Sequence, residues 1–243
     1  MRILGIDTAT SIASAALVED DRIIAEQIHG SPNRFQTTGL KANHAEVVLS
    51  LVEAVLRDAG VPLCKLSGLA VSIGPGSFTG LRIGLSTVKG LAYGLDTPVV
   101  GVSTLHANAA RVENFNGLIC SLLDARKKEV YGALFRRNGD GLARTTEDRV
   151  GSVAEIVALA GKFAGSEPCL FAGDGSIKYQ KLLMDAFGSR AILTSGERYP
   201  SMASAVARLS GKQIHGNGGH NLTALVPVYL RPAEAELKTT NQT

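Results

Sequence analysis

Several features that mark common functional classes are missing from this chain of 243 residues. It contains no Trp and few other aromatic residues, so it offers no stacking platform of the kind that binds single-stranded nucleic acid. Its 25 Lys and Arg residues exceed its 22 Asp and Glu residues by little, and no basic run is long enough to act as a nucleic-acid arm. Strong, direct RNA binding by the chain alone is therefore not indicated.

The cysteines and the apolar segments exclude further classes. Cys64, Cys120 and Cys169 are odd in number and far apart in sequence, so they predict neither a zinc knuckle nor a disulfide framework. No apolar run reaches the roughly 18 residues of a membrane-spanning helix, and the N-terminal residues lack the pattern of a signal peptide. We therefore expect a cytoplasmic α/β protein that does not associate with membranes.

A glycine-rich segment from residue 73 to residue 84 is the most informative part of the chain. It follows an apolar run typical of a buried strand and precedes a long apolar helical pattern. Such a turn presents backbone N–H groups at the positive end of a helix dipole, where proteins often bind phosphate. The candidate residues of this loop are Gly74, Gly76, Ser77, Thr79, Gly80 and Arg82.

The segment nevertheless matches none of the common phosphate or nucleophile motifs. A P-loop requires Lys after its second glycine, whereas Leu81 follows Gly80. A dinucleotide fingerprint that starts at Gly74 requires Gly where Thr79 stands, and the residues around Ser77 do not form a nucleophile elbow. A structural interpretation therefore stands beside the anion site: a tight strand-to-helix turn that Thr79 caps and whose glycines allow close packing.

The order of predicted elements occurs twice along the chain. The first half contains strands over 3–7, 13–18 and 22–28, an irregular segment over 29–43, a helix over 44–59, a strand over 69–73, a helix over 79–95, a strand over 98–102 and a helix from 103. The second half contains strands over 118–124 and 129–135, helices over 153–164, 177–187 and 201–214, intervening strands over 169–172 and 191–193, and a last strand-like run over 225–230. Internal repeats of this kind are strong evidence for a fold.

This order predicts a ribonuclease-H-like α/β fold in duplicate, as in actin, sugar kinases and Hsp70-type ATPases. The two β-β-β-α-β-α-β-α units would cover residues 1–113 and 114–243, the second with a flexible tail. In such ATPases the turns after the first strand of each unit grip phosphates across a cleft, so the candidate nucleotide contacts are Asp7, Thr8, Thr10, Asp124 and Arg126. An Asp at a strand end also often caps a turn through its own side chain, and this interpretation stays open.

Six segments of the chain, 6–10, 44–46, 74–84, 124–126, 129–131 and 227–231, resemble those of the TsaB (YeaZ) family. The resemblance extends nearly from end to end and is most specific at 74–84. It implies a subunit that pairs with TsaD, a catalytic paralogue, and works with the ATPase TsaE. Together they would transfer a threonylcarbamoyl group to N6 of an adenosine in the anticodon loop of tRNAs that read codons starting with A. The chain itself would meet tRNA only indirectly.

The resemblance also implies that this chain is not the catalytic subunit. TsaD-like proteins carry two His residues one helical turn apart that bind a metal, but Leu40 and Val48 stand four residues before and after His44. Glu46 would point to a different face of the helix. We therefore expect no catalytic residue, no metal and no other cofactor. The alternative, from a different class, is an ATP-binding phosphotransferase or ATPase that uses Asp7 and Asp124.

The helices over 44–59 and 79–95 carry apolar residues on more than one face, which predicts that a partner covers part of their surface. In the TsaB resemblance these helices pack against the corresponding pair of TsaD, and the same surface would support a homodimer when the partner is absent. Arg82 is expected to be free for an interdomain or intersubunit contact. The predicted interface residues are His44, Val48, Leu51, Leu85, Val88 and Leu91.

Overall fold

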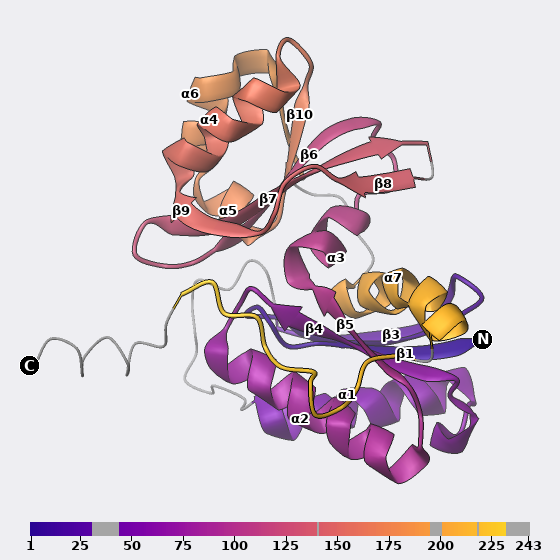
Figure 1. Cartoon of the computed structure of the whole chain (residues 1–243). Helices are drawn as coiled ribbons and strands as arrows, with labels where there is room; N and C mark the ends of the chain where they lie inside the picture. Colours follow the sequence, from indigo (N-terminus) through magenta and orange to yellow (C-terminus); the bar gives the residue numbers. More distant parts are fainter. Residues whose placement is uncertain (31–43, 140, 195–200, 218, 232–243) are drawn as a thin grey trace, which may run out of the picture.

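The computed structural model describes residues 1–30, 44–139, 141–194, 201–217 and 219–231, with the backbone alone at 44–46 and 217. The chain forms two α/β units, one above the other in Figure 1. Most of the predicted irregular segment 29–43, and the part of the predicted flexible tail beyond residue 231, lie outside the described residues.

The first unit is built on a five-stranded sheet with the order β3-β2-β1-β4-β5. Strand β2 is antiparallel to both neighbours, whereas β4 and β5 continue the direction of β1. β1 and β4 are buried along nearly their whole length, as their continuous apolar runs predict. The strands are β1 (Arg2–Asp7), β2 (Ala13–Glu19), β3 (Arg22–His29), β4 (Gly68–Gly74) and β5 (Val99–Ser103).

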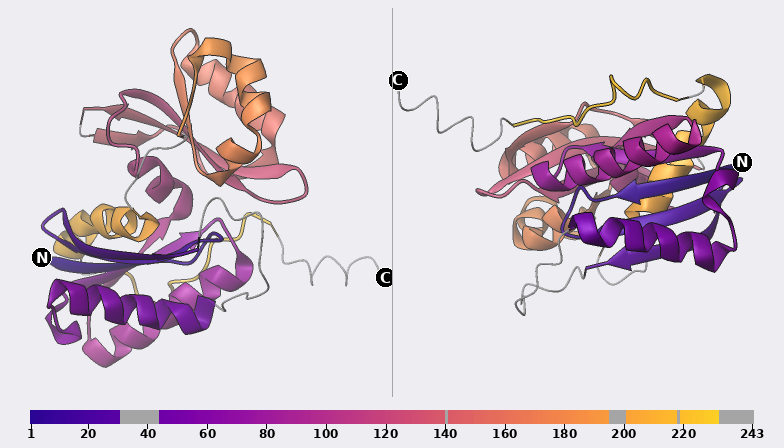
Figure 2. Two further views of the ribbon diagram at one scale, coloured as in Figure 1. Left: turned by 180° about the vertical axis from the view of Figure 1, so that it is seen from behind. Right: turned by 90° about the horizontal axis from the view of Figure 1, so that it is seen from below.

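Helices α1 (His44–Ala59) and α2 (Phe78–Leu95) cover one face of this sheet. They lie side by side, as the view from below in Figure 2 shows. A short 3-10 helix, η1 (Leu63–Lys65), follows α1 and leads into β4. The core between this helical layer and the sheet includes Leu4, Leu17 and Val71 from the strands.

The second unit repeats the arrangement with the strand order β11-β10-β6-β7-β8 and with β9 also paired to β7. As in the first unit, the central strand β6 has one antiparallel neighbour, β7, and one parallel neighbour, β10. The duplicated fold predicted from the sequence is therefore confirmed. The strands are β6 (Gly117–Asp124), β7 (Glu129–Asn138), β8 (Gly141–Arg144), β9 (Arg149–Ser152), β10 (Cys169–Ala172) and β11 (Ala191–Leu193).

Helices α4 (Val153–Ala164) and α6 (Gln180–Phe187) cover one face of the second sheet. The capping box of Ser152 and Glu155 starts α4 at the predicted residue. The single helix predicted over 177–187 is instead two, α5 (Asp174–Lys178) and α6, which meet at Tyr179. A 3-10 helix, η2 (Gly188–Arg190), ends this region.

Two helices lie between the units. Helix α3 (Thr104–Ala110) follows the first sheet and packs both on β6 and β7 of the second and against β4 and β5 of the first, whereas α7 (Met202–Asn217) follows the second sheet but covers the free face of the first. Both lie between the two sheets in Figure 1 and contact each other. The predicted units 1–113 and 114–243 therefore do not match the two cores, because an apolar helical stripe does not show which sheet it covers.

The segment 219–231, which we call the C-terminal strap, runs back over the first unit and ends at the second (yellow in Figure 1). Leu225 is buried in the core of the first unit, and His220 forms an isolated bridge with Val99. The N–H of Val228 donates to the carbonyl of Ile73 at 2.7 Å. These contacts attach the strap to the sheet without making it a strand, so the strand predicted over 225–230 is not present.

Candidate functional site

The glycine-rich segment forms the tight join between β4 and α2. Ser77, and not Thr79, is the N-cap of α2, since its side chain accepts a hydrogen bond from the N–H of Gly80 at 3.2 Å. The N–H of Ser77 donates to the carbonyl of Ala9 at 2.7 Å. Two of the N–H groups that an anion would require are thus used within the protein, which favours the structural interpretation of this segment.

The glycines of the segment allow α2 to lie directly on the turn that follows β1. A Cβ atom at Gly80 would lie 2.0 Å from the carbonyl oxygen of Thr8, and one at Gly76 would lie 2.4 Å from that of Ala9. The hydroxyl of Thr8 donates to the carbonyl of Gly80 at 2.7 Å in the interior. Thr8 is therefore a buried packing residue, which corrects its predicted position at an open phosphate cleft.

Asp7 is also enclosed, with 1% of its surface exposed. One carboxylate oxygen accepts the N–H of Ala9 at 3.4 Å, and the other has no hydrogen-bond partner among the described residues. Burial raises the pKa of Asp7 to about 6, against the opposing effects of Ser72, the Ala9 N–H and Arg111. A carboxyl group sealed from solvent is a poor contact for a nucleotide that must enter and leave.

Asp124, at the same position of the second unit, has a different environment. Its carboxylate pairs with Lys178 at 2.7 Å and accepts the N–H of Arg126 at 3.1 Å. Asp174, whose pKa is raised by burial, accepts the N–H of Asp124 at 3.0 Å. The hydroxyl of Thr10 bonds the backbone of Ile12 in a local turn. Of the five candidate nucleotide contacts, only Arg126 has an exposed side chain.

Most of the predicted interface residues belong to the core of the first unit. Val48, Leu85 and Val88 are buried, and Leu51 and Leu91 are partly buried against the same core. The side chain of His44 lies outside the described residues. The contacts of α2 with β4 and α1 account for the burial of Leu85 and Val88, whereas Leu51 and Leu91 keep part of their side-chain surface exposed. A charged residue at Leu85 would disrupt folding and cannot test an interface.

The outward face of α2 has a different composition. Thr79, Ser86, Gly90 and Tyr93 are exposed at helical spacing, and the surface of Tyr93 is 88% exposed. A Cβ atom at Gly90 would meet nothing within 4 Å. These four residues form a surface, which we call the α2 face, that combines small side chains with an exposed aromatic residue. Leu49, on the neighbouring helix α1, has a half-exposed apolar side chain.

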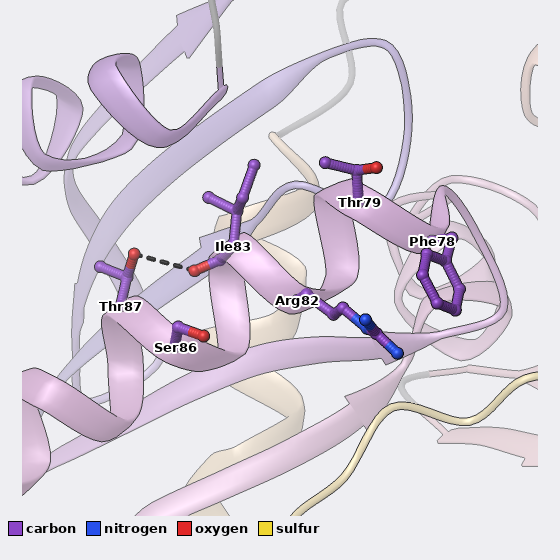
Figure 3. Close-up of a pocket in the computed structure, with 6 residues that line it drawn as sticks. All are labelled: Phe78, Thr79, Arg82, Ile83, Ser86 and Thr87. Atoms are coloured by element: carbon purple, nitrogen blue, oxygen red, sulfur yellow. Dashed lines mark hydrogen bonds between the residues drawn. The ribbon is translucent and has the colours of Figure 1, made fainter.

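A groove of about 410 Å³ lies at the first turns of the α2 face (Figure 3). Two side chains at its edge, Phe78 and Ile83, are apolar, and Thr87 uses its hydroxyl to donate to the carbonyl of Ile83 at 2.9 Å. The groove therefore offers apolar side chains and small hydroxyl groups. Its lining residues are Phe78, Thr79, Arg82, Ile83, Ser86 and Thr87.

Arg82 joins this groove to the C-terminal strap. Its guanidinium carbon lies 3.9 Å from the ring centre of Phe78, and its Nε donates to the hydroxyl of Tyr229 at 3.0 Å. The rings of Phe78 and Tyr229 stack with their centres 4.8 Å apart. The prediction that Arg82 is free is therefore wrong, because Arg82 is engaged within its own chain.

The strap ends on the second unit through Arg231. Its Nη1 donates to the carbonyl of Ala125 at 3.2 Å, and its guanidinium also pairs with Glu129. The strap thus connects the start of α2 with the hairpin turn of β6 and β7. Residues 227–231 belong to a family segment, but no local pattern predicts their contacts, since such long-range pairs leave no periodic signal in the sequence.

Two general findings bear on cofactors and membranes. Within the described ranges, no three His, Cys, Asp or Glu side chains are grouped closely enough to hold a metal ion. None of the helices in the same part of the chain has the length and apolarity needed to cross a bilayer.

Comparison with known protein sequences connects the chain to tRNA modification. Residues 36–238 match the model of the TsaD family, described as tRNA N6-adenosine threonylcarbamoyltransferase. The chain is 34% identical to tRNA threonylcarbamoyladenosine biosynthesis protein TsaB of Bacillus subtilis (strain 168), over 98% of this chain and 97% of that protein. A tRNA N6-adenosine threonylcarbamoyltransferase of Novosphingobium aromaticivorans is 31% identical, over 88% of this chain and 66% of that protein.

Solved structures agree with the sequence comparison. YeaZ from Pseudomonas aeruginosa matches with a TM-score of 0.72 and 26% identity, over 94% of this chain and 99% of that one. Component A of (R)-2-hydroxyglutaryl-CoA dehydratase from Acidaminococcus fermentans, with a TM-score of 0.52, 10% identity and coverage of 88% of this chain and 99% of that one, shares the fold alone. Together with the near full-length match to the B. subtilis protein, these similarities show that the chain belongs to the TsaB (YeaZ) family, which is named for the biosynthesis of threonylcarbamoyladenosine in tRNA.

Proposed function

We propose that this chain is a non-catalytic subunit of a tRNA threonylcarbamoyltransferase, which pairs with a TsaD-like catalytic paralogue and works with a TsaE-like ATPase in the cytoplasm. The observation that carries the proposal is the α2 face. It has small, exposed residues at Ser86 and Gly90, and it carries the exposed ring of Tyr93. Aromatic side chains on an otherwise flat surface are common anchors of protein interfaces.

A paralogue is a suitable partner for this face because it would share the duplicated fold. Its own helical layer would present two neighbouring helices to α1 and α2, and helices pack closely where small residues form the contact. Leu49 of α1 and Phe78 of α2 are further exposed apolar side chains of this helical layer. A second copy of the chain would use the same surface, so a homodimer is expected when the paralogue is absent.

The enclosed candidate residues support a non-catalytic role. An ATPase mechanism would require Asp7 or Asp124 to approach a bound nucleotide. Asp7 is sealed, and Asp124 is held by Lys178. The alternative of an ATP-binding phosphotransferase therefore has less support than the subunit role.

The interface is tested by the substitution Ser86→Glu, which places a charge in the centre of the α2 face. We expect its affinity for the TsaD-like paralogue to fall on the order of 100-fold or more, because the new carboxylate would be buried without a partner. The thermal stability of the isolated chain should not change, since Ser86 is exposed. Titration calorimetry would measure the affinity for the paralogue, and size-exclusion chromatography with mass measurement would detect both the heterodimer and the homodimer.

A matched control is Ala158→Glu, which adds the same charge at an exposed position on α4 of the second unit. It should pair as the parent chain does. Equal affinity of both variants for the paralogue would exclude the α2 face as the interface.

The absence of catalysis needs a separate test. Calorimetry of the isolated chain with ATP and magnesium should give no micromolar binding, and clear binding with hydrolysis would overturn the non-catalytic assignment.

A further inference from the structure

The guanidinium group of Arg82 lies at the groove on the first turns of α2 and is held there by two aromatic residues. Its central carbon lies 3.9 Å from the ring centre of Phe78 and 6.0 Å from that of Tyr229. Its Nε donates to the hydroxyl of Tyr229 at 3.0 Å. These contacts use the flat face of the guanidinium and one of its five N–H groups. The N–H groups on the two Nη atoms have no partner among the described residues, and the side chain is exposed.

The residues that hold Arg82 are themselves fixed. The rings of Phe78 and Tyr229 stack with their centres 4.8 Å apart. The N–H of Val228, next to Tyr229, donates to the carbonyl of Ile73 and so attaches the strap to the end of β4 at 2.7 Å. An arginine side chain that binds a ligand usually loses much rotamer freedom. Here a large part of that freedom is already lost in the free chain, which favours binding at the Nη atoms.

The charge of Arg82 is not balanced by an acid. In the part of the chain that the structure describes, no Asp or Glu forms an ion pair with it, although several other arginines are paired. A guanidinium group binds a carboxylate through two parallel N–H···O bonds, in a geometry that its planar fork fits closely. The described arginines with an acidic partner on another element or turn are Arg2, Arg136, Arg144, Arg208 and Arg231.

The groove beside Arg82 has a suitable size and chemistry for an acidic side chain. Its volume of about 410 Å³ exceeds that of any single side chain, and in Figure 3 the guanidinium lies beside the ring of Phe78. Thr79 and Ser86 contribute exposed hydroxyl groups that have no hydrogen-bond partner among the described residues. Phe78 and Ile83 contribute apolar surface, which would exclude water from an ion pair and strengthen it.

We propose that Arg82 binds an Asp or Glu side chain of the TsaD-like paralogue. This inference rests on the proposed function, because the groove shares Thr79 and Ser86 with the α2 face that we assign to this partner. Arginine and tyrosine are the residue types that most often dominate the energy of protein interfaces. A phosphate of tRNA would fit the same fork, but surfaces that bind nucleic acid are more polar and more basic than this groove with its apolar edges.

The test is a double-mutant cycle with the full chain and its paralogue. Arg82→Gln removes the charge and the fork, and in the paralogue each exposed Asp or Glu on its two interface helices is changed in turn to Asn or Gln. We expect Arg82→Gln to weaken pairing by roughly 10- to 100-fold in titration calorimetry. One acid of the paralogue should give a similar loss, and the two changes together should give little more than either alone.

The matched control is Arg149→Gln, which removes an exposed arginine of β9 that has no ion pair among the described residues. It should pair as the parent chain does. If no acid of the paralogue is coupled to Arg82, the inference is overturned even where Arg82→Gln weakens pairing, because loss of the bond to Tyr229 alone would then explain the effect. Unchanged pairing with weaker binding of a labelled, unmodified tRNA to the complex would assign Arg82 to RNA and also overturn it.

A further variant separates this inference from the proposed function. Tyr93→Ala removes the exposed ring of the α2 face and leaves Arg82 in place. If Tyr93→Ala weakens pairing and Arg82→Gln does not, the interface stands and the role of Arg82 is refuted. If neither variant weakens pairing, the α2 face is not the interface, and this inference fails together with it.

Discussion

The turns that follow the first strand of each unit have the same place in the fold and opposite surroundings. In the first unit, Asp7 and Thr8 are buried beneath the start of α2. In the second unit, Asp124 is partly exposed and paired with Lys178. The side chains of residues 126–128, which are all cationic, are exposed. The comparison shows that duplication has preserved the backbone arrangement but not the chemistry of the strand ends.

The position of the helix that follows the neighbouring parallel strand explains the difference. In the first unit, α2 approaches the turn itself, and a Cβ atom at Gly80 would lie 2.0 Å from the Thr8 carbonyl. In the second unit, the close contact is made by Gly173, the residue before the corresponding helix α5, where a Cβ atom would lie 2.1 Å from the carbonyl of Leu122. This contact lies two residues before Asp124, and α5 reaches Asp124 only through the side chains of Asp174 and Lys178, so residues 126–128 stay exposed.

The largest effect is expected from Gly80→Ala, which would separate α2 from the first turn. Its methyl group would collide with the backbone of Thr8, which cannot move aside as a side chain can, so we expect a loss of about 3 kcal/mol or more in the free energy of unfolding. The control on the same helix is Gly90→Ala, whose methyl group meets nothing within 4 Å. It should gain roughly 0.5–1 kcal/mol from helix propensity. Chemical denaturation of the isolated chain measures both, and equal losses would disprove the close contact at Gly80.

The second effect distinguishes the two aspartates. The pKa of Asp7 is about 6 in the folded chain and lower in the unfolded chain, so the native state retains a proton between about pH 4 and pH 6 that the unfolded state releases. The free energy of unfolding therefore falls as pH rises through this window. Asp7→Asn should remove the fall and stabilise the chain at pH 7 by about 2–3 kcal/mol, at about 1.4 kcal/mol per pKa unit.

Asp124→Asn is the matching substitution in the second unit. It weakens a partly exposed ion pair with Lys178, so we expect a loss of less than about 1 kcal/mol. Denaturant titrations at several pH values between 4 and 8 would compare the two variants. If Asp7→Asn destabilises the chain at pH 7, the effects of Ser72, the Ala9 N–H and Arg111 on the Asp7 carboxylate outweigh the cost of its burial.

The smallest effect concerns the strap that links the two units. Tyr229→Phe keeps the stacked ring on Phe78 but removes the hydroxyl that accepts from Arg82, and we expect a loss of about 0.5–1 kcal/mol. Tyr93→Phe removes an exposed hydroxyl from the same helical layer and should have no measurable effect. Thermal denaturation under identical conditions compares them, and a similar response would mean that the Arg82 bond adds no stability.

Local patterns predicted the elements of both units well. The bounds of α1, α4, β10 and β11 match the predicted ranges, and for α4 the capping box of Ser152 and Glu155 marks the start. The sequence predicts Thr79 as the N-cap of α2, whereas the structure has Ser77 at that position. Both residue types are suitable caps, and only the path of the turn distinguishes them.

Contacts between distant segments were beyond such patterns. The apolar positions of α2 indicated burial, but Val88 and Leu85 meet their own sheet and not a partner, a choice that depends on where α1 lies. Arg82 pairs with a residue 147 positions later. The left-handed residues of the β6–β7 turn were missed as well, because Arg-Lys-Lys gives no glycine or asparagine signal for positive φ.

The position of α7 has a consequence for how this protein folds during translation. The first sheet leaves the ribosome with α1 and α2 available, but its other face is covered mainly by α7, which ends at residue 217. The apolar side chains on that face, among them Ile3, Ala70 and Val100, meet only α3 until α7 has been synthesised. The first unit therefore cannot complete its core before the second unit has emerged from the ribosome.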